Sequence, residues 1–225
     1  MAGLDKRVAS YEAALEGLTD GMTLLAGGFG LCGIPENLIA EVQRRQVQGL
    51  TVVSNNCGVD GFGLGMLLES RQVSKVVASY VGENALFEQL VLSGELAVEL
   101  TPQGTLAEKI RAGGAGLGGV LTPTGVGTIV EDSPFCLGKQ TIDGRDYLLM
   151  KPIRADFALI NGYLVDKFGN IWYKGTTRNF NIVMATAADV VIAEADNVVE
   201  IGDIQPENVV TSGAFVNYIV DGGNA

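Results

Sequence analysis

The sequence contains no histidine, and this absence limits the chemistry that the chain can perform by itself. A Ser-His-Asp triad and a metal site with histidine ligands are both excluded within the chain. Any general acid or base must therefore be a carboxylate, a lysine, a cysteine or a tyrosine, or must come from another chain.

Cysteine is also scarce. The three cysteines are Cys32, Cys57 and Cys136, which lie far apart and form no C-x-x-C motif. Their odd number and wide spacing argue against a disulfide framework and against a zinc site. We therefore expect no bound metal, and a reducing cytoplasm as the location of the protein.

Basic residues are few, with 15 lysines and arginines against 26 acidic residues and a net charge of −11. A surface this acidic argues against nucleic-acid binding, which depends on cations that neutralise phosphates. No apolar run approaches 18 residues, so no transmembrane helix is expected. The first 18 residues lack the apolar core of a signal peptide, so we expect neither secretion nor membrane association.

Apolar residues and glycine are abundant: 47% of the 225 residues are hydrophobic and 31 are glycine. This composition predicts one large domain over residues 1–225 with a sizeable core. Short apolar strands alternate with helical patterns over residues 22–112, which is typical of right-handed βαβ units. The predicted fold is α/β, with a mostly parallel open sheet and helices on both faces.

The most informative stretch is DGMTLLAGGFGLCGIP at residues 20–35. A strand over 22–26 is followed by a glycine loop over 27–33, and Pro35 and Glu36 then begin a helix. Glycines leave no Cβ in the way, so backbone N–H groups of this loop can approach an anion or a carbonyl oxygen closely.

The same loop fits the dinucleotide pattern G-x-G-x-x-G. That pattern also needs an acidic residue about 20 residues later, to hold a ribose hydroxyl. The next strand, over 50–54, ends instead in Ser54, Asn55 and Asn56. A nicotinamide-dependent dehydrogenase is therefore disfavoured, although it stays an alternative.

Periodicity and turn signals predict several further elements. Asp143 and Gly144 suit the turn of a β-hairpin, which we expect near residues 132–151 as an excursion from the domain. The apolar tail over 209–220 is expected to be extended, on the domain edge or against a partner. The other expected elements are helices over 6–18, 61–70 and 185–188, and a strand over 190–193.

Neutral polar residues recur where the predicted strands end. Asn55, Asn56, Asn84 and Gln103 all follow strands whose carboxyl ends meet at one edge of a parallel sheet, where ligands of open α/β sheets bind. Amide donors suit a carbonyl or carboxylate oxygen that gains charge in a transition state. Such residues are also what short βα turns need, but these three tips and the glycine loop together make four tips in one sheet, which favours a site.

Several strings of the sequence resemble one family. Residues 20–35 match the first signature of the class I CoA-transferases. Five further strings resemble the A (alpha) subunit of the two-subunit 3-oxoacid CoA-transferases: SNNCGVDGFGLG, SYVGEN, SGELAVELTPQGTLAEKIRAGGAG, TPTGVGT and RNFN. The resemblance extends from about residue 20 to residue 220.

The resemblance implies the fold of ribose-5-phosphate isomerase and glucosamine-6-phosphate deaminase. It also implies transfer of CoA from an acyl-CoA, usually succinyl-CoA, to a 3-oxo acid such as acetoacetate. In this family, a glutamate in an S-E-N-G motif of the B (beta) subunit forms a glutamyl-CoA thioester. This chain has only V-G-E-N at 81–84, and Glu83 is the related position. We expect Glu83 not to be the nucleophile, and no catalytic residue in this chain.

The implied partner is the B (beta) subunit of a CoA-transferase, in a heterodimer or heterotetramer. The implied substrates are CoA thioesters, with no permanently bound cofactor. By motif, Asn55, Asn56 and Gln103 would line the acyl site and polarise carbonyl oxygens. The residues that would contact CoA or its acyl group are Gly27, Gly28, Phe29, Gly30, Leu31, Cys32 and Gly33.

The substrates stay open at this point, because GGAGLGGVLTPTGVGT resembles the bacterial acetate/acetoacetate transferases and Ser212 replaces a usual proline. Acetoacetate, 3-oxoadipate, short-chain acids and a cationic 3-oxo acid such as dehydrocarnitine are all candidates. Two other functions stay open as well. One is a sugar-phosphate isomerase or deaminase, which the shortage of lysine and arginine at the strand tips disfavours. The other is a purely structural subunit.

Overall fold

The computed structural model describes residues 4–223, and one large sheet organises them. Seven strands run parallel in the order β11-β10-β8-β1-β2-β3-β4, and short β9 pairs antiparallel with β8. In chain order the strands are β1 (Thr23–Ala26), β2 (Leu50–Val53), β3 (Val73–Ala78), β4 (Ala97–Leu100), β8 (Ala155–Asp166), β9 (Ile171–Trp172), β10 (Ala188–Val199) and β11 (Tyr218–Asp221).

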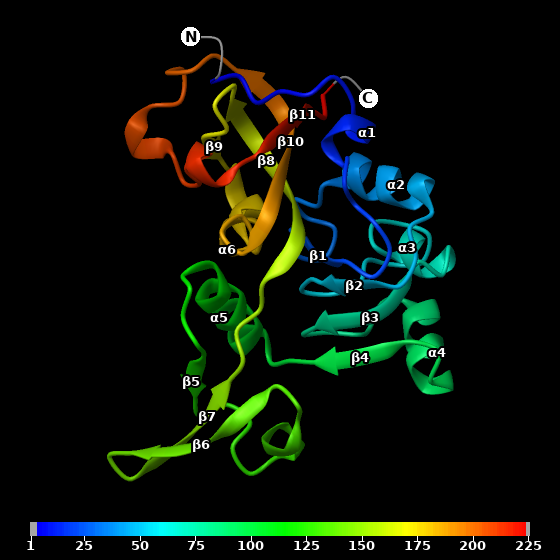
Figure 1. The fold of residues 1–225 in the computed structure, drawn as a ribbon, viewed down its shortest axis with the longest axis vertical. Coiled ribbons are helices and arrows are strands. Elements are labelled where there is room, and N and C mark those ends of the chain that lie inside the picture. The colour runs from blue at the N-terminus through cyan, green and yellow to red at the C-terminus, as the bar shows by residue number, and fades with distance from the viewer. Residues whose placement is uncertain (1–3, 224–225) are drawn as a thin grey trace.

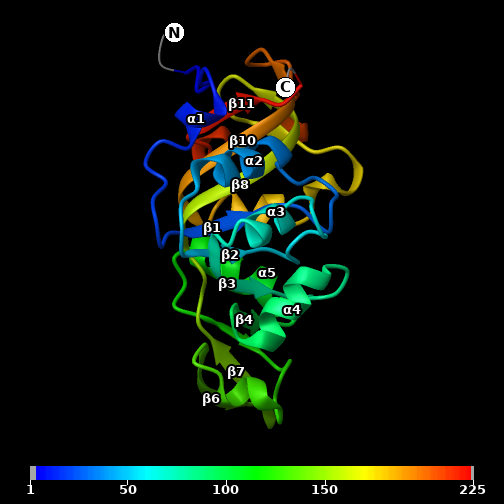
Figure 2. The ribbon, with the colours of Figure 1, turned by 90° about the vertical axis from the view of Figure 1, so that its right-hand side faces the viewer.

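Helices cover both faces of this sheet (Figures 1 and 2). Alternate strand residues point to opposite faces, so Leu24 belongs to the apolar cluster under α1 to α4 and Leu25 to the cluster under α5 and α6. The helices are α1 (Tyr11–Ala14), α2 (Glu36–Arg45), α3 (Gly65–Glu69), α4 (Ala85–Ser93), α5 (Gln103–Gly114) and α6 (Asn181–Met184). The α/β architecture expected from the sequence is confirmed.

A second, smaller sheet lies beyond β4, at the lower end of the molecule in Figure 1. It is antiparallel, with the order β5-β7-β6, and consists of β5 (Val120–Thr122), β6 (Cys136–Ile142) and β7 (Arg145–Met150). Asp143 and Gly144, the residues that suggested a turn, connect β6 to β7, and both have positive φ. The connecting segments contain short 3-10 helices over Ile129–Asp132, Gly175–Arg178, Pro206–Asn208 and Gly213–Phe215.

The helix predicted over 6–18 was wrong in its extent, because only α1 is helical there. Residues 6–8 instead pair with β11: Val8 N donates to Ile219 O at 3.0 Å, and Ile219 N donates to Lys6 O at 3.0 Å. Ser10 then begins α1 by accepting a hydrogen bond from Ala13 N. Tertiary pairing with the sheet edge therefore overrides the helical periodicity of this segment. The tail lies on that edge as β11, as expected.

Two other helices were misplaced. Over 61–70 only α3 is helical, because the preceding residues form a tight turn in which Val59 and Phe62 pair. Over 185–188 the prediction was wrong: the helix there, α6, ends at Met184, and Ala188 begins β10. The expected strand over 190–193 lies within β10.

Candidate functional site

The candidate site lies where β1, β2, β3 and β4 end. These four strands are parallel neighbours in the sheet, so the segments that follow them, 27–33, 54–56, 79–84 and 101–105, meet at one edge. The sequence predicted this arrangement from the strand pattern alone. We refer to it as the carboxyl edge.

The glycine loop after β1 makes a tight turn before α2. Phe29 N donates to Cys32 O at 3.1 Å and Cys32 N donates to Phe29 O at 3.0 Å, so Gly30 and Leu31 form the tip. Gly30 has a φ of +59°, and a Cβ there would meet nothing within 4 Å. The backbone at the tip therefore favours glycine and has open space next to it. A ligand could approach such a surface closely.

Gly27 and Gly28, in contrast, are required by packing within the chain. A Cβ on Gly27 would lie 1.8 Å from Asn181 Oδ1, and one on Gly28 would lie 2.5 Å from Ile34 Cγ2. Asn181 is fully buried, and its amide group accepts from Asn161 N at 3.0 Å and donates to Gly33 O at 2.9 Å. The first half of the loop is thus held by α6 and β8, while its tip stays exposed.

A chain of hydrogen bonds joins the segments of the carboxyl edge. Gly30 N donates to Asn55 Oδ1 at 2.9 Å, and the Ser79 hydroxyl donates to Asn55 O at 2.9 Å and to Gln103 Oε1 at 3.4 Å. Within residues 4–223, the amide nitrogens Asn55 Nδ2 and Gln103 Nε2 have no acceptor. The acceptor oxygens of these side chains are therefore held by the protein, and the amide donors are left for a ligand.

Asn56 lies beside Asn55 and is only 7% exposed, and its side chain makes no hydrogen bond to any described residue. Its amide atoms are not fully buried, so they are accessible to a ligand or to a partner chain. Asn84, the fourth amide suggested by the sequence, is used internally. Its Oδ1 accepts from Phe87 N at the start of α4, and its Nδ2 donates to Cys57 O at 3.0 Å.

Three potential nucleophiles near this edge are poorly placed for attack. Burial raises the pKa of the Cys57 thiol to about 12, which keeps it protonated. Asp60 accepts hydrogen bonds from Ala85 N and Leu86 N and so caps α4. Glu83 is exposed, has a φ of +67°, and makes no side-chain hydrogen bond to a described residue. These surroundings do not orient or activate the Glu83 carboxylate.

Large apolar side chains surround the amides. Four of them are between 40% and 49% exposed. Phe29, Leu31 and Tyr80 lie on the loops of the carboxyl edge, and Phe62 lies in the turn before α3. Exposed apolar groups next to unpaired amide donors are typical of a surface that is covered in use, by a ligand or by another chain.

Sequence reasoning missed Glu194 on β10. It is buried, and its carboxylate accepts hydrogen bonds from Leu38 N at 2.8 Å, Asn37 N at 3.2 Å and Asn37 Nδ2 at 3.1 Å. Burial raises its pKa to about 7, although the N–H groups of α2 act in the opposite direction. Glu194 thus fixes the start of α2 directly after the glycine loop. A lone glutamate inside an apolar strand was the available signal.

Comparison with known proteins identifies the family. The sequence model described as "Coenzyme A transferase" matches residues 8–222, which is nearly the whole chain. The chain belongs to the coenzyme A transferase family. It is 49% identical over 223 residues to the A (alpha) subunit of a probable succinyl-CoA:3-ketoacid coenzyme A transferase of Bacillus subtilis, covering 98% of this chain and 92% of that protein. This finding confirms the resemblance to the alpha subunit that the motifs indicated.

Two relatives of this coenzyme A transferase chain are longer than the region that it matches. It is 48% identical to the mitochondrial succinyl-CoA:3-ketoacid coenzyme A transferase 2A of Mus musculus, over 93% of this chain but only 43% of that protein. An acyl-CoA transferase of Escherichia coli O157:H7 has the same fold, with a TM-score of 0.87 and 20% identity, over 97% of this chain and 47% of that one. The chain thus spans about half the length of these two proteins.

No helix among residues 4–223 is both long and apolar enough to cross a membrane.

Proposed function

We propose that this chain is the non-nucleophilic alpha subunit of a CoA-transferase that moves CoA from succinyl-CoA to a 3-oxo acid. The observation that carries the proposal is the set of unpaired amide donors at the carboxyl edge, on Asn55, Asn56 and Gln103. Neutral donors stabilise a thioester or carboxylate oxygen as it gains charge, and they do not repel or protonate an attacking carboxylate.

The nucleophile is supplied by a separate beta subunit. Glu83 is unsuited to the role by its exposure and its lack of oriented contacts, and the family resemblance assigns the nucleophile to an S-E-N-G motif that this chain lacks. The mouse relative is more than twice as long as the matched region, which is consistent with a second half that carries this role.

The reaction divides between the two chains as follows. The partner's glutamate attacks the thioester carbonyl of succinyl-CoA, and the oxygen that becomes negative accepts hydrogen bonds from the amide edge. CoA thiolate leaves, which gives a mixed anhydride of succinate and the glutamate; the thiolate then attacks the glutamyl carbonyl and expels succinate, which gives the glutamyl-CoA thioester. The glycine tip at Gly30 gives the acyl group or pantetheine arm close access to the backbone. The carboxylate of the 3-oxo acid then attacks the glutamyl-CoA thioester and displaces the thiolate, which attacks the 3-oxoacyl carbonyl of the new anhydride and regenerates the glutamate. Acetoacetate is the proposed acceptor, and dehydrocarnitine is the cationic alternative for an acidic protein.

Reconstitution tests the proposal. This chain and its beta subunit are purified separately, and transfer from succinyl-CoA is measured for each chain and for their mixture against acetoacetate, 3-oxoadipate and dehydrocarnitine. We expect neither chain alone to act and the mixture to act. Transfer by this chain alone, abolished in Glu83→Ala, would overturn the proposal. The preferred acid in the panel identifies the acceptor.

A further inference from the structure

A second region of interest lies on the α5 face of the sheet, toward the amino ends of the strands. A cavity of about 320 Å³ opens there between the sheet, α5 and the segment that leads from β7 to β8. Among its lining residues, four are cationic and one is acidic: Lys75, Lys109, Lys151 and Arg154, with Glu99. The whole chain has only 15 lysines and arginines, so this concentration is unusual for a protein of net charge −11.

The most buried cation of this group, Lys109, has one hydrogen-bond acceptor for its three N–H groups. The Lys109 side chain is 1% exposed, and its ammonium donates to Glu99 Oε1 at 2.6 Å and to no other described residue. The Phe135 ring lies 5.0 Å away, and an aromatic face offers no oxygen acceptor. An ammonium has three N–H groups, so two remain without a protein acceptor and face the cavity.

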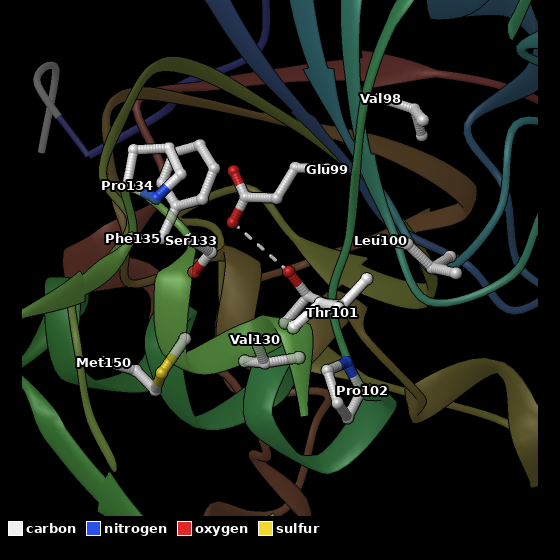
Figure 3. A pocket seen from close by; sticks show the side chains of 11 residues that line it. Val98, Glu99, Leu100, Thr101, Pro102, Val130, Ser133, Pro134, Phe135 and Met150 are labelled. Carbon is white, nitrogen blue, oxygen red and sulfur yellow. Dashed lines mark hydrogen bonds between the residues drawn. The ribbon is translucent and has the colours of Figure 1, made fainter. Parts of the chain in front are cut away.

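Glu99 is shared between two lysines. Its Oε2 lies 3.2 Å from Lys75 Nζ, while its Oε1 binds Lys109 and also accepts from the Thr101 hydroxyl at 3.2 Å. Figure 3 shows this carboxylate beside the Phe135 ring. Phe135 lines both the cationic cavity and a second, more apolar cavity of about 310 Å³ between β4 and the small sheet. One carboxylate cannot neutralise both ammonium groups.

The remaining cations are held in place by neighbouring segments. Lys151 N donates to Phe135 O at 2.8 Å, and Lys151 forms no ion pair with a described residue. Arg154 pairs with Asp189 at 2.7 Å. After Glu99 offsets one lysine and Asp189 offsets Arg154, two lysine charges remain. Asp156 does not line the cavity, but its carboxylate accepts from N of the lining residue Thr23 at 2.7 Å and keeps its negative charge, so the net excess around the cavity is one positive charge.

We propose that this cavity binds a phosphate-type dianion. The excess of lysine ammonium groups over carboxylates attracts a phosphate group, and the N–H groups of Lys109 that have no protein acceptor match its acceptor oxygens. A free phosphate or the phosphate group of a small metabolite would satisfy the same chemistry. The proposal concerns a site at the amino-end half of the strands and does not depend on the function proposed above.

Isothermal titration of the full-length chain with inorganic phosphate, at ionic strength matched with sodium chloride, tests the site. We expect one saturable site, and Lys151→Met to weaken binding by about 10-fold. Lys139→Met is the matched control, because Lys139 is an exposed lysine on β6 whose ion pairs are with Glu131 and Asp146. It should leave the affinity unchanged. Both altered side chains are exposed, and melting temperatures verify that both variants fold.

Absence of saturable binding, or equal affinity in both variants, would overturn the site. Loss of phosphate binding when the beta subunit is added would show that a protein carboxylate fills the cavity, and would also overturn the assignment to a small dianion. Titration with adenosine 3′,5′-bisphosphate alongside inorganic phosphate distinguishes the two sources of the phosphate group. Tighter binding of the bisphosphate would indicate a metabolite, and tighter binding of inorganic phosphate would indicate the free ion.

Discussion

Two regions of the same strands carry different kinds of polarity. At the carboxyl ends, β2 leads to Asn55 and Asn56, and unpaired amides lie beside the glycine tip. On the α5 face, β3 and β4 carry Lys75 and Glu99 into a cavity with further cations. The sheet thus places neutral donors at its carboxyl edge and full charges on its α5 face.

The difference in polarity reflects the ligand that each of the two proposed sites would bind. A reaction whose nucleophile is a carboxylate from another chain needs oxygens to be stabilised without a fixed ammonium that would bind the nucleophile itself. Neutral amides meet this requirement. A bound dianion instead gains from full positive charges, which help to offset the cost of its desolvation. The experiments below test this contrast.

The largest expected effect concerns whether the glycine loop is fixed by packing. Gly27→Ala would place a Cβ 1.8 Å from Asn181 Oδ1 and displace the hydrogen bond from Asn161 N. We expect the free energy of unfolding to fall by about 4 kcal/mol, from overpacking plus a lost buried hydrogen bond. Urea unfolding measures this, with Gly118→Ala, which has open space, as control. A Gly27→Ala protein as stable as the control would contradict the packing role.

The next effect tests neutrality at the carboxyl edge. Asn55→Asp keeps the oxygen that accepts from Gly30 N but replaces the Nδ2 donor with negative charge. We expect kcat of the complex with the beta subunit to fall about 100- to 1,000-fold, the usual loss for one such donor. Steady-state kinetics and melting temperature give the readouts. Asn208→Asp, at an exposed position in the 3-10 helix Pro206–Asn208, is the control. A rate close to that of the unaltered complex would refute the role of Asn55.

A third experiment examines the anchor beneath the glycine loop. The pKa of Glu194 is raised from 4.5 to about 7 in the folded chain. Stability contributed by a raised pKa is present below the unfolded value and is lost as pH rises through the folded value. The unaltered chain should therefore lose about 3 kcal/mol relative to Glu194→Gln between pH 4.5 and pH 7.5. Urea unfolding across pH measures this.

The exposed residue Glu207 supplies the control for that experiment, and Glu207→Gln should follow the pH profile of the unaltered chain. Parallel profiles for Glu194→Gln and the unaltered chain would show that burial of Glu194 does not control the pH dependence.

The smallest effect compares the two ends of β1 directly. Gly21 and Gly30 have φ of +78° and +59°, and a Cβ at either would meet nothing within 4 Å. Alanine at each position should cost about 1 kcal/mol of stability through backbone strain alone. Only Gly30→Ala should also raise KM for the acyl-CoA, by about 10-fold, because only that end belongs to the proposed substrate site. Equal KM values for both variants would contradict a ligand contact at the tip.

Much of the fold was predictable from sequence, and the exceptions have physical causes. Apolar strand runs and glycine turns predicted the parallel sheet and its carboxyl edge, because these signals are local. The helix predicted over 6–18 failed because residues 6–8 pair with β11, a contact about 210 residues away in the chain.

The site was predictable only in part for the same reason. Asn55 and Gln103 were chosen by their position after strands, which fixes the edge but not the partners of each atom. Asn84 and Asn55 look alike in sequence, yet only the fold reveals that Asn84 is consumed by capping α4. Glu194 and the lysine cavity depend on segments that meet only in three dimensions.

The location of the covalent intermediate tests the central claim most directly. The complex of this chain with its beta subunit is incubated with succinyl-CoA, the glutamyl thioester is trapped with hydroxylamine, and the modified peptide is identified by mass spectrometry. We expect modification of a glutamate of the beta subunit and an unmodified peptide containing Glu83. Modification at Glu83 would contradict the assignment of the nucleophile to the partner chain.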